Sequence, residues 1–454
     1  MTSGDLTRRQ FVAAVSAGSL AAAASRTVPA YGNLTKKASQ LAILGGEPVR
    51  KNKPWPDWPS CCWDEKLTES LLKTARSGIW CRIQSASGAV PTFEKEYARM
   101  TGARFCIATG SGTQALHTCV EALGIGPGDE VITSPYTDPG TIQGILSARA
   151  LPVLADLDVE SYQLDPADVE KKITENTRAI MPVHMMGQPA DMDSIMAIAK
   201  KHNLKVIEDA CQAWLAQWRG KCCGTLGDLG CFSFQNSKHL PCGEGGAVVG
   251  NDEDLMDRVH AYHNCGRAFG NMPKTGPNPV LGTNRRMTEY QAAVLLNQMK
   301  RLEADTALRW ENGKYLTSKI KDIPGIVPHR LYEGVTQAVY HLYPFRYLKE
   351  HFNNAPRAKF LAALSAEGIP CSGGYGPQYR DGLIEAALSS KNFKRSFSKA
   401  RLDRYREELH YPGNDQLCQQ AVWIGQNMLL TGKQDMDDIA KAIAKIYENR
   451  DKLV

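Results

Sequence analysis

One lysine stands among small and aromatic residues, in a stretch with little other charge and just before a glycine-rich turn. Lys238 follows the segment 231–237 and precedes the turn at 243–246. An amine in such a setting can form a Schiff base with an aldehyde cofactor. The alternative is an ordinary loop lysine whose stem is covered while its ammonium reaches water. This stretch alone leaves both interpretations open.

A second group of candidates lies at the end of an expected strand over residues 205–208. Asp209 and Gln212 follow that strand directly. An acid at the carboxyl end of a parallel strand points into the ligand crevice of the sheet. Asp209 is suited to hold the protonated nitrogen of a cofactor ring, and Gln212 to donate to a ring oxygen. An isolated aspartate in this position more often caps a helix, so Asp209 alone favours the structural interpretation.

The third candidate is a turn that could hold a phosphate. Residues 109–113 read Thr-Gly-Ser-Gly-Thr, between an expected strand and an expected helix. Glycines let the backbone approach a ligand, and the helix N-terminus offers free N–H groups. Ser111, Thr113 and the more distant Ser233 add hydroxyl groups. The turn lacks the lysine of a Walker loop and the spacing of a dinucleotide motif, so by itself it is a weak signal.

Alternating short apolar strands and helices must position these groups. The expected strands cover residues 105–108, 131–133, 152–155, 179–183 and 205–208, and the expected helices cover 93–100, 115–123, 141–148 and 192–202. This alternation is typical of a parallel sheet with helices on both faces. Ligands of such sheets bind beyond the carboxyl ends of the strands, where the three candidate sites would meet.

The second half of the chain indicates a smaller α+β region. A long helix is expected over 287–311, followed by strands within 339–347 and helices over 357–367, 416–427 and 435–448. A chain of 454 residues is too long for one simple core. We expect a signal peptide at 1–30, an arm at 31–60, a large domain at 61–305 and a small domain at 306–454.

Composition excludes several classes of protein. Hydrophobic residues make up 43% and charged residues 22%, as in ordinary globular proteins. The net charge of +6 comes from scattered lysines and arginines, without zinc-finger spacing, so we expect no nucleic-acid partner. The 13 cysteines fit no metal-binding spacing and no disulfide framework. We expect no metal and mostly small buried thiols.

The N-terminus predicts export. Arg8 and Arg9 precede a short alanine-rich stretch, and a small-residue motif ends at Ala30. These three features in order fit a bacterial twin-arginine signal, although an arginine pair before an alanine helix can arise by chance. The apolar run is too short for a convincing membrane span. We therefore expect a periplasmic or extracytoplasmic protein without a membrane span in the mature chain.

The phosphate turn, the strand-end aspartate and the lysine follow one another in the order found in pyridoxal-phosphate enzymes of the aspartate aminotransferase fold. More narrowly, the chain resembles the DegT/StrS-type sugar aminotransferases over nearly all of its mature length. The matching segments are 111–116, 126–131, 182–188, 208–212, 227–228, 232–246 and 282–289. The resemblance implies an α/β protein of fold type I, with a mostly parallel, helix-covered sheet and a smaller C-terminal α+β domain.

The resemblance also implies a role for each matched residue. Lys238 is expected to be the Schiff-base lysine and proton shuttle, Asp209 to hold the pyridine nitrogen, and Gln212 to meet the 3-hydroxyl of the pyridoxal phosphate. The residues expected at the phosphate are Gly112, Thr113 and Ser233, and Asn284 of the neighbouring subunit. The expected protein is thus a homodimer with shared active sites.

By the same resemblance, the expected reaction is a transamination. An amino acid, glutamate or glutamine, is expected to donate its amino group, and a keto-sugar or keto-cyclitol to accept it.

The chain departs from the family at two positions on the substrate side. Asp138 stands where the family has an aromatic ring that stacks on the cofactor, unless Tyr136 substitutes for it, and Arg285 also replaces an aromatic. An acid at position 138 is suited to meet a polar substrate or to raise the basicity of nearby imines. We expect substrate contacts from Asp138, Tyr136, Arg285 and His239, although His239 is first interpreted as a structural histidine.

Two other functions stay open at this stage. One is a sugar dehydratase using the same cofactor, but such relatives carry histidine in place of the lysine, so Lys238 argues against it. The other is an exported protein that binds the cofactor without turnover. Asp138 and the export signal keep this second alternative open, because sugar nucleotides are not expected outside the cytoplasm. A response of the bound cofactor to amino donors would separate it from a transaminase.

Overall fold

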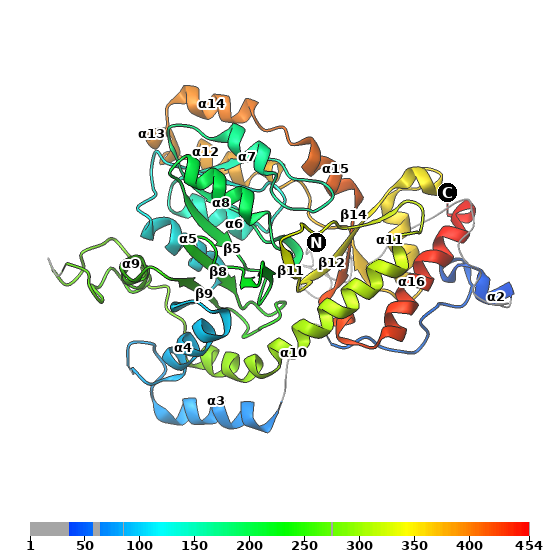
Figure 1. Cartoon of the computed structure of the whole chain (residues 1–454), viewed down its shortest axis with the longest axis horizontal. Coiled ribbons are helices and arrows are strands. Elements are labelled where there is room, and N and C mark those ends of the chain that lie inside the picture. Colours follow the sequence, from blue (N-terminus) through cyan, green and yellow to red (C-terminus); the bar gives the residue numbers. More distant parts are fainter. Residues whose placement is uncertain (1–35, 58–63, 85, 274–275, 454) are drawn as a thin grey trace, which may run out of the picture.

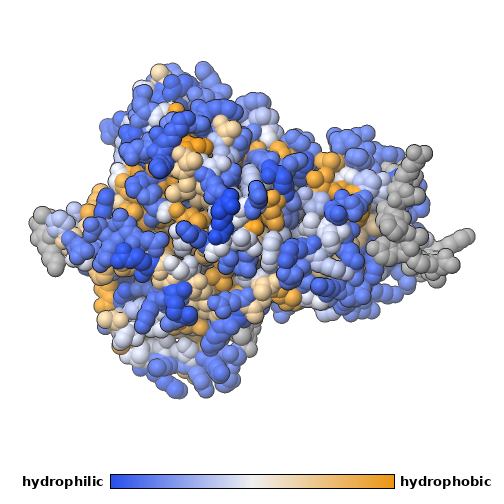
Figure 2. All heavy atoms as spheres, in the orientation of Figure 1, coloured by the Kyte–Doolittle hydropathy of each residue, from blue (hydrophilic) through white to orange (hydrophobic). Residues whose placement is uncertain are grey.

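The computed structural model describes residues 36–57, 64–84, 86–273 and 276–453. The expected signal peptide at 1–30 lies outside the described residues. No helix in these ranges is both long enough and apolar enough to cross a membrane. Hydrophilic residues cover most of the face seen in Figure 2, with smaller apolar patches between them.

A seven-stranded sheet forms the centre of the larger part of the chain (Figure 1). Its strands are β1 (Phe105–Thr109), β2 (Glu130–Thr133), β3 (Leu151–Leu154), β4 (Thr177–Met181), β5 (Lys205–Asp209), β8 (Leu229–Ser233) and β9 (Gly246–Gly250), in the order β1-β9-β8-β5-β4-β2-β3. Only β9 runs against its two neighbours. The expected mostly parallel sheet is confirmed, and the strands are nearly continuous apolar runs because both faces are covered.

Helices cover both faces of this sheet. Those of the larger part are α3 (Glu65–Ser77), α4 (Ala89–Thr101), α5 (Gly112–Ala122), α6 (Pro139–Ser147), α7 (Pro166–Lys172), α8 (Met192–Lys201) and α9 (Glu253–His263). Successive residues of a strand point to opposite faces of the sheet, and this separates the helices into two groups. Ile207 packs with α5, α6 and α9 on one face, and Val206 packs with α7 and α8 on the other. Ser111 and Asp138 cap α5 and α6, so both helices begin at the carboxyl edge of the sheet.

One long helix, α10 (Glu289–Ile320), joins the two parts of the chain (Figure 1). It begins with a capping box formed by Thr288 and Gln291. Leu295 in its first half packs on the large sheet, and Leu316 in its second half packs in the other core. The expected limit at residue 305 falls inside this helix, and the domain limits stay a prediction.

The smaller part contains an antiparallel sheet of β10 (Ile326–Pro328), β12 (Leu342–Tyr347), β14 (Ala421–Gly425) and β13 (Cys371–Ser372), in that order. Its main helices are α11 (Arg357–Ala366) and α16 (Lys433–Glu448). The expected helix over 416–427 is wrong in its second half, because α15 (Pro412–Gln420) ends at residue 420 and β14 follows. Residues 421–424 read Ala-Val-Trp-Ile and are buried between two strands, so sheet pairing overrides the helical pattern.

A segment of the C-terminal half returns to the large sheet. It consists of η4 (Gln378–Arg380), α12 (Leu383–Ser389), α13 (Phe393–Ser396) and α14 (Lys399–Glu407), which lie over α6 and β3 (Figure 1). Arg401 of α14 forms a buried ion pair with Glu130, at 2.6 Å. The edge strand β3 is therefore covered rather than exposed.

Short elements complete the described chain. A small sheet is formed by β6 (Gln217–Trp218), β7 (Lys221–Cys222) and β11 (Val335–Gln337). The remaining helices are α2 (Lys36–Ser39), η1 (Ala42–Leu44), η2 (Met185–Gly187), η3 (Lys349–Phe352), η5 (Gln426–Leu430) and η6 (Arg450–Lys452). Residues 36–57 lie against the smaller part, where Leu41 is buried and Arg50 pairs with Asp435 at 2.5 Å.

Candidate active site

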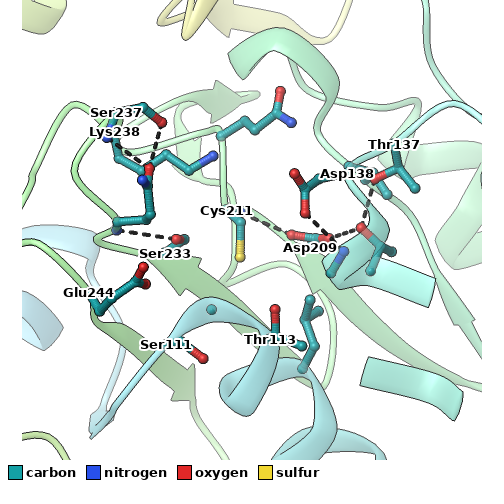
Figure 3. Close-up of a pocket in the computed structure, with 17 residues that line it drawn as sticks. Ser111, Thr113, Thr137, Asp138, Asp209, Cys211, Ser233, Ser237, Lys238 and Glu244 are labelled. Carbon is teal, nitrogen blue, oxygen red and sulfur yellow. Dashed lines mark hydrogen bonds between the residues drawn. The ribbon is translucent and has the colours of Figure 1, made fainter. Parts of the chain in front are cut away.

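A cavity of about 370 Å³ lies where the parallel strands end (Figure 3). Strands β1, β2, β5 and β8 all deliver residues to it, because their carboxyl ends meet at one edge of the sheet. Eight of the residues singled out from the sequence line it: Ser111, Gly112, Thr113, Asp138, Asp209, Gln212, Ser233 and Lys238. The sheet thus brings the three candidate sites together as expected.

The N-terminus of α5 forms one wall of this cavity. Ser111 accepts a hydrogen bond from the Gln114 N–H at 3.2 Å, while the N–H groups of Gly112 and Thr113 precede the first intrahelical bond. A Cβ atom at position 112 would lie 2.7 Å from the Cβ atom of Ser233. Only glycine therefore lets the turn approach β8 so closely. Free N–H groups beside a hydroxyl suit a phosphate group.

Asp209 is a buried carboxylate at the end of β5, with 3% of its surface exposed. Its Oδ2 accepts from the Thr141 hydroxyl at 2.7 Å, and its Oδ1 from the Cys211 N–H at 3.1 Å. Burial raises the pKa of Asp209 above its usual value, against the lowering effect of these two hydrogen bonds. A cationic partner, such as a protonated ring nitrogen, would stabilise the ionised form of this buried carboxylate.

Asp138 places a second carboxylate at the same cavity. Its Oδ1 accepts from the Gly140 N–H at 2.9 Å and so caps α6. The side chain is exposed to the cavity, and within the described ranges no lysine or arginine pairs with it. Its negative charge contributes to the raised pKa of Asp209. The cavity therefore holds acidic groups from the ends of two strands, β2 and β5, which lie on either side of β4.

Lys238 enters the cavity from the loop after β8 (Figure 3). The loop is held by the bond from the Lys238 N–H to the Gln235 carbonyl, at 2.9 Å, and by the bond from the Gln426 amide to the Ser237 carbonyl, at 2.7 Å. The Lys238 amine lies 6.0 Å from the centre of the Trp214 ring. It forms no salt bridge with any described carboxylate, so its amine is free for chemistry.

Gln212 connects the cavity to the smaller part of the chain. Its Oε1 accepts from the Met186 N–H at 2.9 Å, and its Nε2 donates to the Tyr375 hydroxyl at 3.2 Å. Sequence reasoning missed Tyr375, together with the lining residues Thr141 and Cys211. Thr141 lies in the first turn of α6, just after the capping Asp138, which could have pointed to it, but no local signal places Tyr375 here.

Tyr136 and Arg285 do not line the cavity. Tyr136 is fully buried and packs edge-on against Tyr375, with ring centres 5.5 Å apart. Arg285 is buried and forms an ion pair with Glu121 at 2.5 Å and a hydrogen bond to Thr118 at 3.0 Å. The expected substrate contacts from these two residues are not supported, because packing and the ion pair already engage their side chains.

His239 also lies behind the cavity wall rather than in it. Its ring is buried, 5.0 Å from the Trp214 ring and 5.9 Å from the His341 ring, centre to centre. Burial, and then the nearby Arg309 guanidinium, hold the pKa of His239 well below its usual value. A neutral, enclosed imidazole behind Lys238 fits the structural interpretation, not a substrate contact.

Asn284 lies on the surface of its own chain. It is exposed, accepts a hydrogen bond from the Arg286 N–H at 3.4 Å and does not line the cavity. A contribution to a site can therefore come only through a second subunit.

His184, Glu208 and Cys223 lie close enough together to resemble a set of metal ligands. The carboxylate of Glu208, however, is already engaged by His184 at 2.9 Å and by the N–H groups of Gly224, Leu226 and Gly227, each at 2.7 Å. These bonds fix the loop between β7 and β8, so the cluster has a structural role. The eleven described cysteines are all free.

The fold and the cavity together define a fold-type-I aminotransferase. The DegT/DnrJ/EryC1/StrS aminotransferase family matches residues 62–443, and the chain belongs to this family. A "Putative L-glutamine:3-amino-2,3-dideoxy-scyllo-inosose aminotransferase" of Streptoalloteichus tenebrarius is 36% identical over 424 residues, covering 91% of this chain and 99% of the relative. An "L-glutamine:scyllo-inosose aminotransferase" of Streptomyces griseus is 34% identical, covering 90% and 98%.

Solved structures are similar over the same length. A 3-amino-5-hydroxybenzoic acid synthase shares 30% identity and a TM-score of 0.74, covering 87% of this chain and 99% of that chain. DesI, solved in the presence of its TDP-sugar product, shares 26% identity and a TM-score of 0.70, covering 90% and 96%. The chain is an aminotransferase, and the aminotransferases of its family depend on pyridoxal phosphate.

Proposed function

We propose that this enzyme binds pyridoxal phosphate and transfers the amino group of an amino acid, in the first place glutamine, to a keto-cyclitol. One observation carries the proposal: Lys238, Asp209 and the N-terminus of α5 line a single cavity. The names of the relatives support the substrates, since both quoted relatives are named as glutamine-dependent aminotransferases of inosose compounds. A keto-sugar acceptor is the second possibility within the same reaction.

The residues of the cavity fit the cofactor. The free N–H groups of Gly112 and Thr113, with the Ser233 hydroxyl, suit its phosphate. Asp209 suits its ring nitrogen because a protonated nitrogen would compensate the buried carboxylate. When bound, pyridoxal phosphate supplies an aldehyde for an imine and a ring that accepts electrons.

The chain's own groups then handle the protons. Asp209 would keep a proton on the ring nitrogen. The hydrogen bond from Thr141 orients the Asp209 carboxylate for this role. Lys238 would remove the proton from the α-carbon of the donor and deliver it to the carbon of the cofactor that carries the aldehyde. Because no described carboxylate pairs with the Lys238 amine, this amine can act as the base.

The cavity suits a polyhydroxylated acceptor. Hydroxyl groups of Thr113, Thr137, Thr141 and Ser237 line it, and Asp138 adds an exposed carboxylate. These groups can exchange hydrogen bonds with the ring hydroxyls of a cyclitol. Lys238 is present where the dehydratase alternative requires histidine. The amino-transfer measurement described at the end of the Discussion tests this function against the non-turnover alternative.

We further propose that the enzyme is a homodimer in which Asn284 serves the partner's active site. Three exposed apolar residues lie near this asparagine, Trp80 (50%), Ile83 (54%) and Leu281 (90%). The bridge between Cys81 and Thr288 sets the segment of Trp80 beside that of Asn284. Exposed apolar side chains next to an exposed binding residue favour an interface at this surface.

Mixing two inactive variants is expected to restore activity if the site is shared. Asn284→Ala impairs both sites of its dimer, and Lys238→Ala inactivates both sites of its own. A mixed dimer holds one intact site, made of Lys238 from one chain and Asn284 from the other. Refolding the two variants together is expected to recover roughly a quarter of wild-type turnover, because about half of random dimers are mixed and each has one good site. Each variant refolded alone is the control, and no recovery above these controls would contradict the shared site.

A further inference from the structure

A second cavity, of about 300 Å³, adjoins the active site on the side of the smaller part of the chain. The loop 373–377, which reads Gly-Gly-Tyr-Gly-Pro, forms one wall. The charged and polar side chains that line the cavity are Arg357, Arg380, Asp415, Tyr375 and Gln419. We call this cavity the Arg357 groove. Nothing in the mechanism above uses it.

Arg357 is the uncompensated charge of the groove. It is half-buried at the start of α11, and its Nη1 donates to the Ala421 carbonyl at 2.7 Å. No carboxylate of the described chain lies within ion-pair distance of it. Arg380 differs, because it pairs with Asp415 at 2.6 Å. A half-buried guanidinium without an anionic partner marks a place where an anion gains binding energy.

The glycine loop packs directly on the guanidinium. A Cβ atom at position 373 would lie 3.0 Å from the Arg357 Nη2 atom. Gly374 has a φ of +83°, and a Cβ atom there would lie 2.6 Å from the Tyr136 hydroxyl. Position 374 therefore needs glycine, and the loop lies between Arg357 and the buried Tyr136.

One tyrosine separates the groove from the active-site cavity. The Tyr375 side chain lines the Arg357 groove, while its hydroxyl accepts from Gln212 of the active site at 3.2 Å. A ligand anion at Arg357 would thus lie within one side-chain length of the residues that surround the cofactor. The groove is positioned to hold part of a substrate whose reacting atom lies in the main cavity.

The charges of the two cavities indicate which substrate group binds in the Arg357 groove. The main cavity is lined by three carboxylates, Asp138, Asp209 and Glu244, and by one lysine, Lys238, which reacts with the cofactor. Such a cavity repels a carboxylate that has no other cation to meet. An amino donor always carries a carboxylate, whereas a keto-cyclitol is uncharged. We propose that Arg357, with the loop 373–377, binds a carboxylate of the amino donor; this rests on the proposed amino-transfer function.

The proposal is tested by direct binding and by separating the two halves of the reaction. The variants are Arg357→Met, which removes the charge, and Arg357→Lys, which retains it. Lys359→Met is the matched control, because Lys359 lies on the same helix and does not line the groove. The probe is glutarate, a dicarboxylate without an amine, titrated calorimetrically into the cofactor-loaded enzyme.

Arg357→Met is expected to weaken glutarate and glutamine binding by roughly 10- to 100-fold, as loss of a charge-assisted hydrogen bond does. Arg357→Lys is expected to recover part of this loss. The dissociation constant for the keto-cyclitol, measured with the amine form of the enzyme, and the melting temperature are expected to stay near the wild-type values. Glutarate binding needs no turnover, so it tests the groove even if the enzyme fails to transfer an amino group.

Three results would overturn the proposal. If Arg357→Met bound glutarate and glutamine as tightly as the wild type, the donor carboxylate would not bind in the groove. Weaker binding of inorganic phosphate or of a nucleotide-linked keto-sugar, with donor binding unchanged, would assign the groove to a phosphate of the acceptor. Equal losses for donor and acceptor, with a lower melting temperature, would show that Arg357 only supports the fold.

Discussion

Replacing Lys238 by alanine is expected to reduce amino transfer by roughly 10³-fold or more, because the variant loses both the nucleophile and the base. The cofactor can still enter the cavity, since the N-terminus of α5 and Ser233 remain. It is then bound without a covalent link. Treatment with borohydride, which fixes an imine, is expected to attach the cofactor to the wild-type peptide that contains Lys238 and to leave the variant unlabelled.

Lys221→Ala is the matched control for this experiment. Lys221 is exposed on β7 and does not line the cavity, so its removal is expected to change neither turnover nor labelling. The fold should tolerate Lys238→Ala, because Lys238 is half-buried and forms no salt bridge in the described chain. Wild-type turnover in Lys238→Ala, or labelling at another lysine, would refute the assignment.

Asp209→Asn is expected to lower turnover by roughly 100-fold or more. Asparagine fits the same space, but it carries no charge to keep a proton on the ring nitrogen. The ring then accepts electrons less well when the α-carbon of the donor loses its proton. Single-turnover kinetics with glutamine measure the effect on this step. Asp254→Asn, at an exposed position on α9, is the control, and turnover within a few-fold of wild type in Asp209→Asn would contradict the role of the carboxylate.

The same substitution is expected to stabilise the protein when the cofactor is absent. The pKa of Asp209 is raised in the folded state, mainly by burial, so the folded state retains a proton that the unfolded state loses. This contribution to the free energy of unfolding is full below the unfolded pKa and is lost as pH rises through the folded pKa. Asp209→Asn removes the cost of the buried charge. The cofactor-free variant should therefore melt at a higher temperature than wild type at neutral pH, and a lower melting temperature would contradict this account.

Residues with a local signal were predicted well. Asp209 ends a short apolar strand and Gly112 and Lys238 come soon after one, and the carboxyl ends of parallel strands meet at one edge. The position of such a residue in its strand is enough to place it at the ligand cavity. Asn284 is exposed on its own chain, and its expected contact with a partner's site stays a prediction.

Residues whose partners come from distant parts of the chain were not predicted. The charge of Arg285 is taken by Glu121, and nothing in the segment around Arg285 indicates that partner. Tyr136 follows a strand as Asp138 does, yet its ring turns into the core between the two parts of the chain. Tyr375 reaches Gln212 only because the smaller part lies against the large sheet. The contacts of these side chains depend on residues that are distant in the sequence, and a single sequence does not show which distant residues meet.

Transfer of a labelled nitrogen tests the central claim most directly. The cofactor-loaded enzyme is incubated with glutamine carrying ¹⁵N in its α-amino group and with scyllo-inosose, and the products are identified by mass spectrometry. We predict an amino-cyclitol with one ¹⁵N atom and an equal amount of the keto acid derived from glutamine. If neither this acceptor nor a panel of keto-sugars gains the label, and the bound cofactor stays in its aldehyde form with every amino acid, the chain binds the cofactor without turnover and the proposed function is wrong.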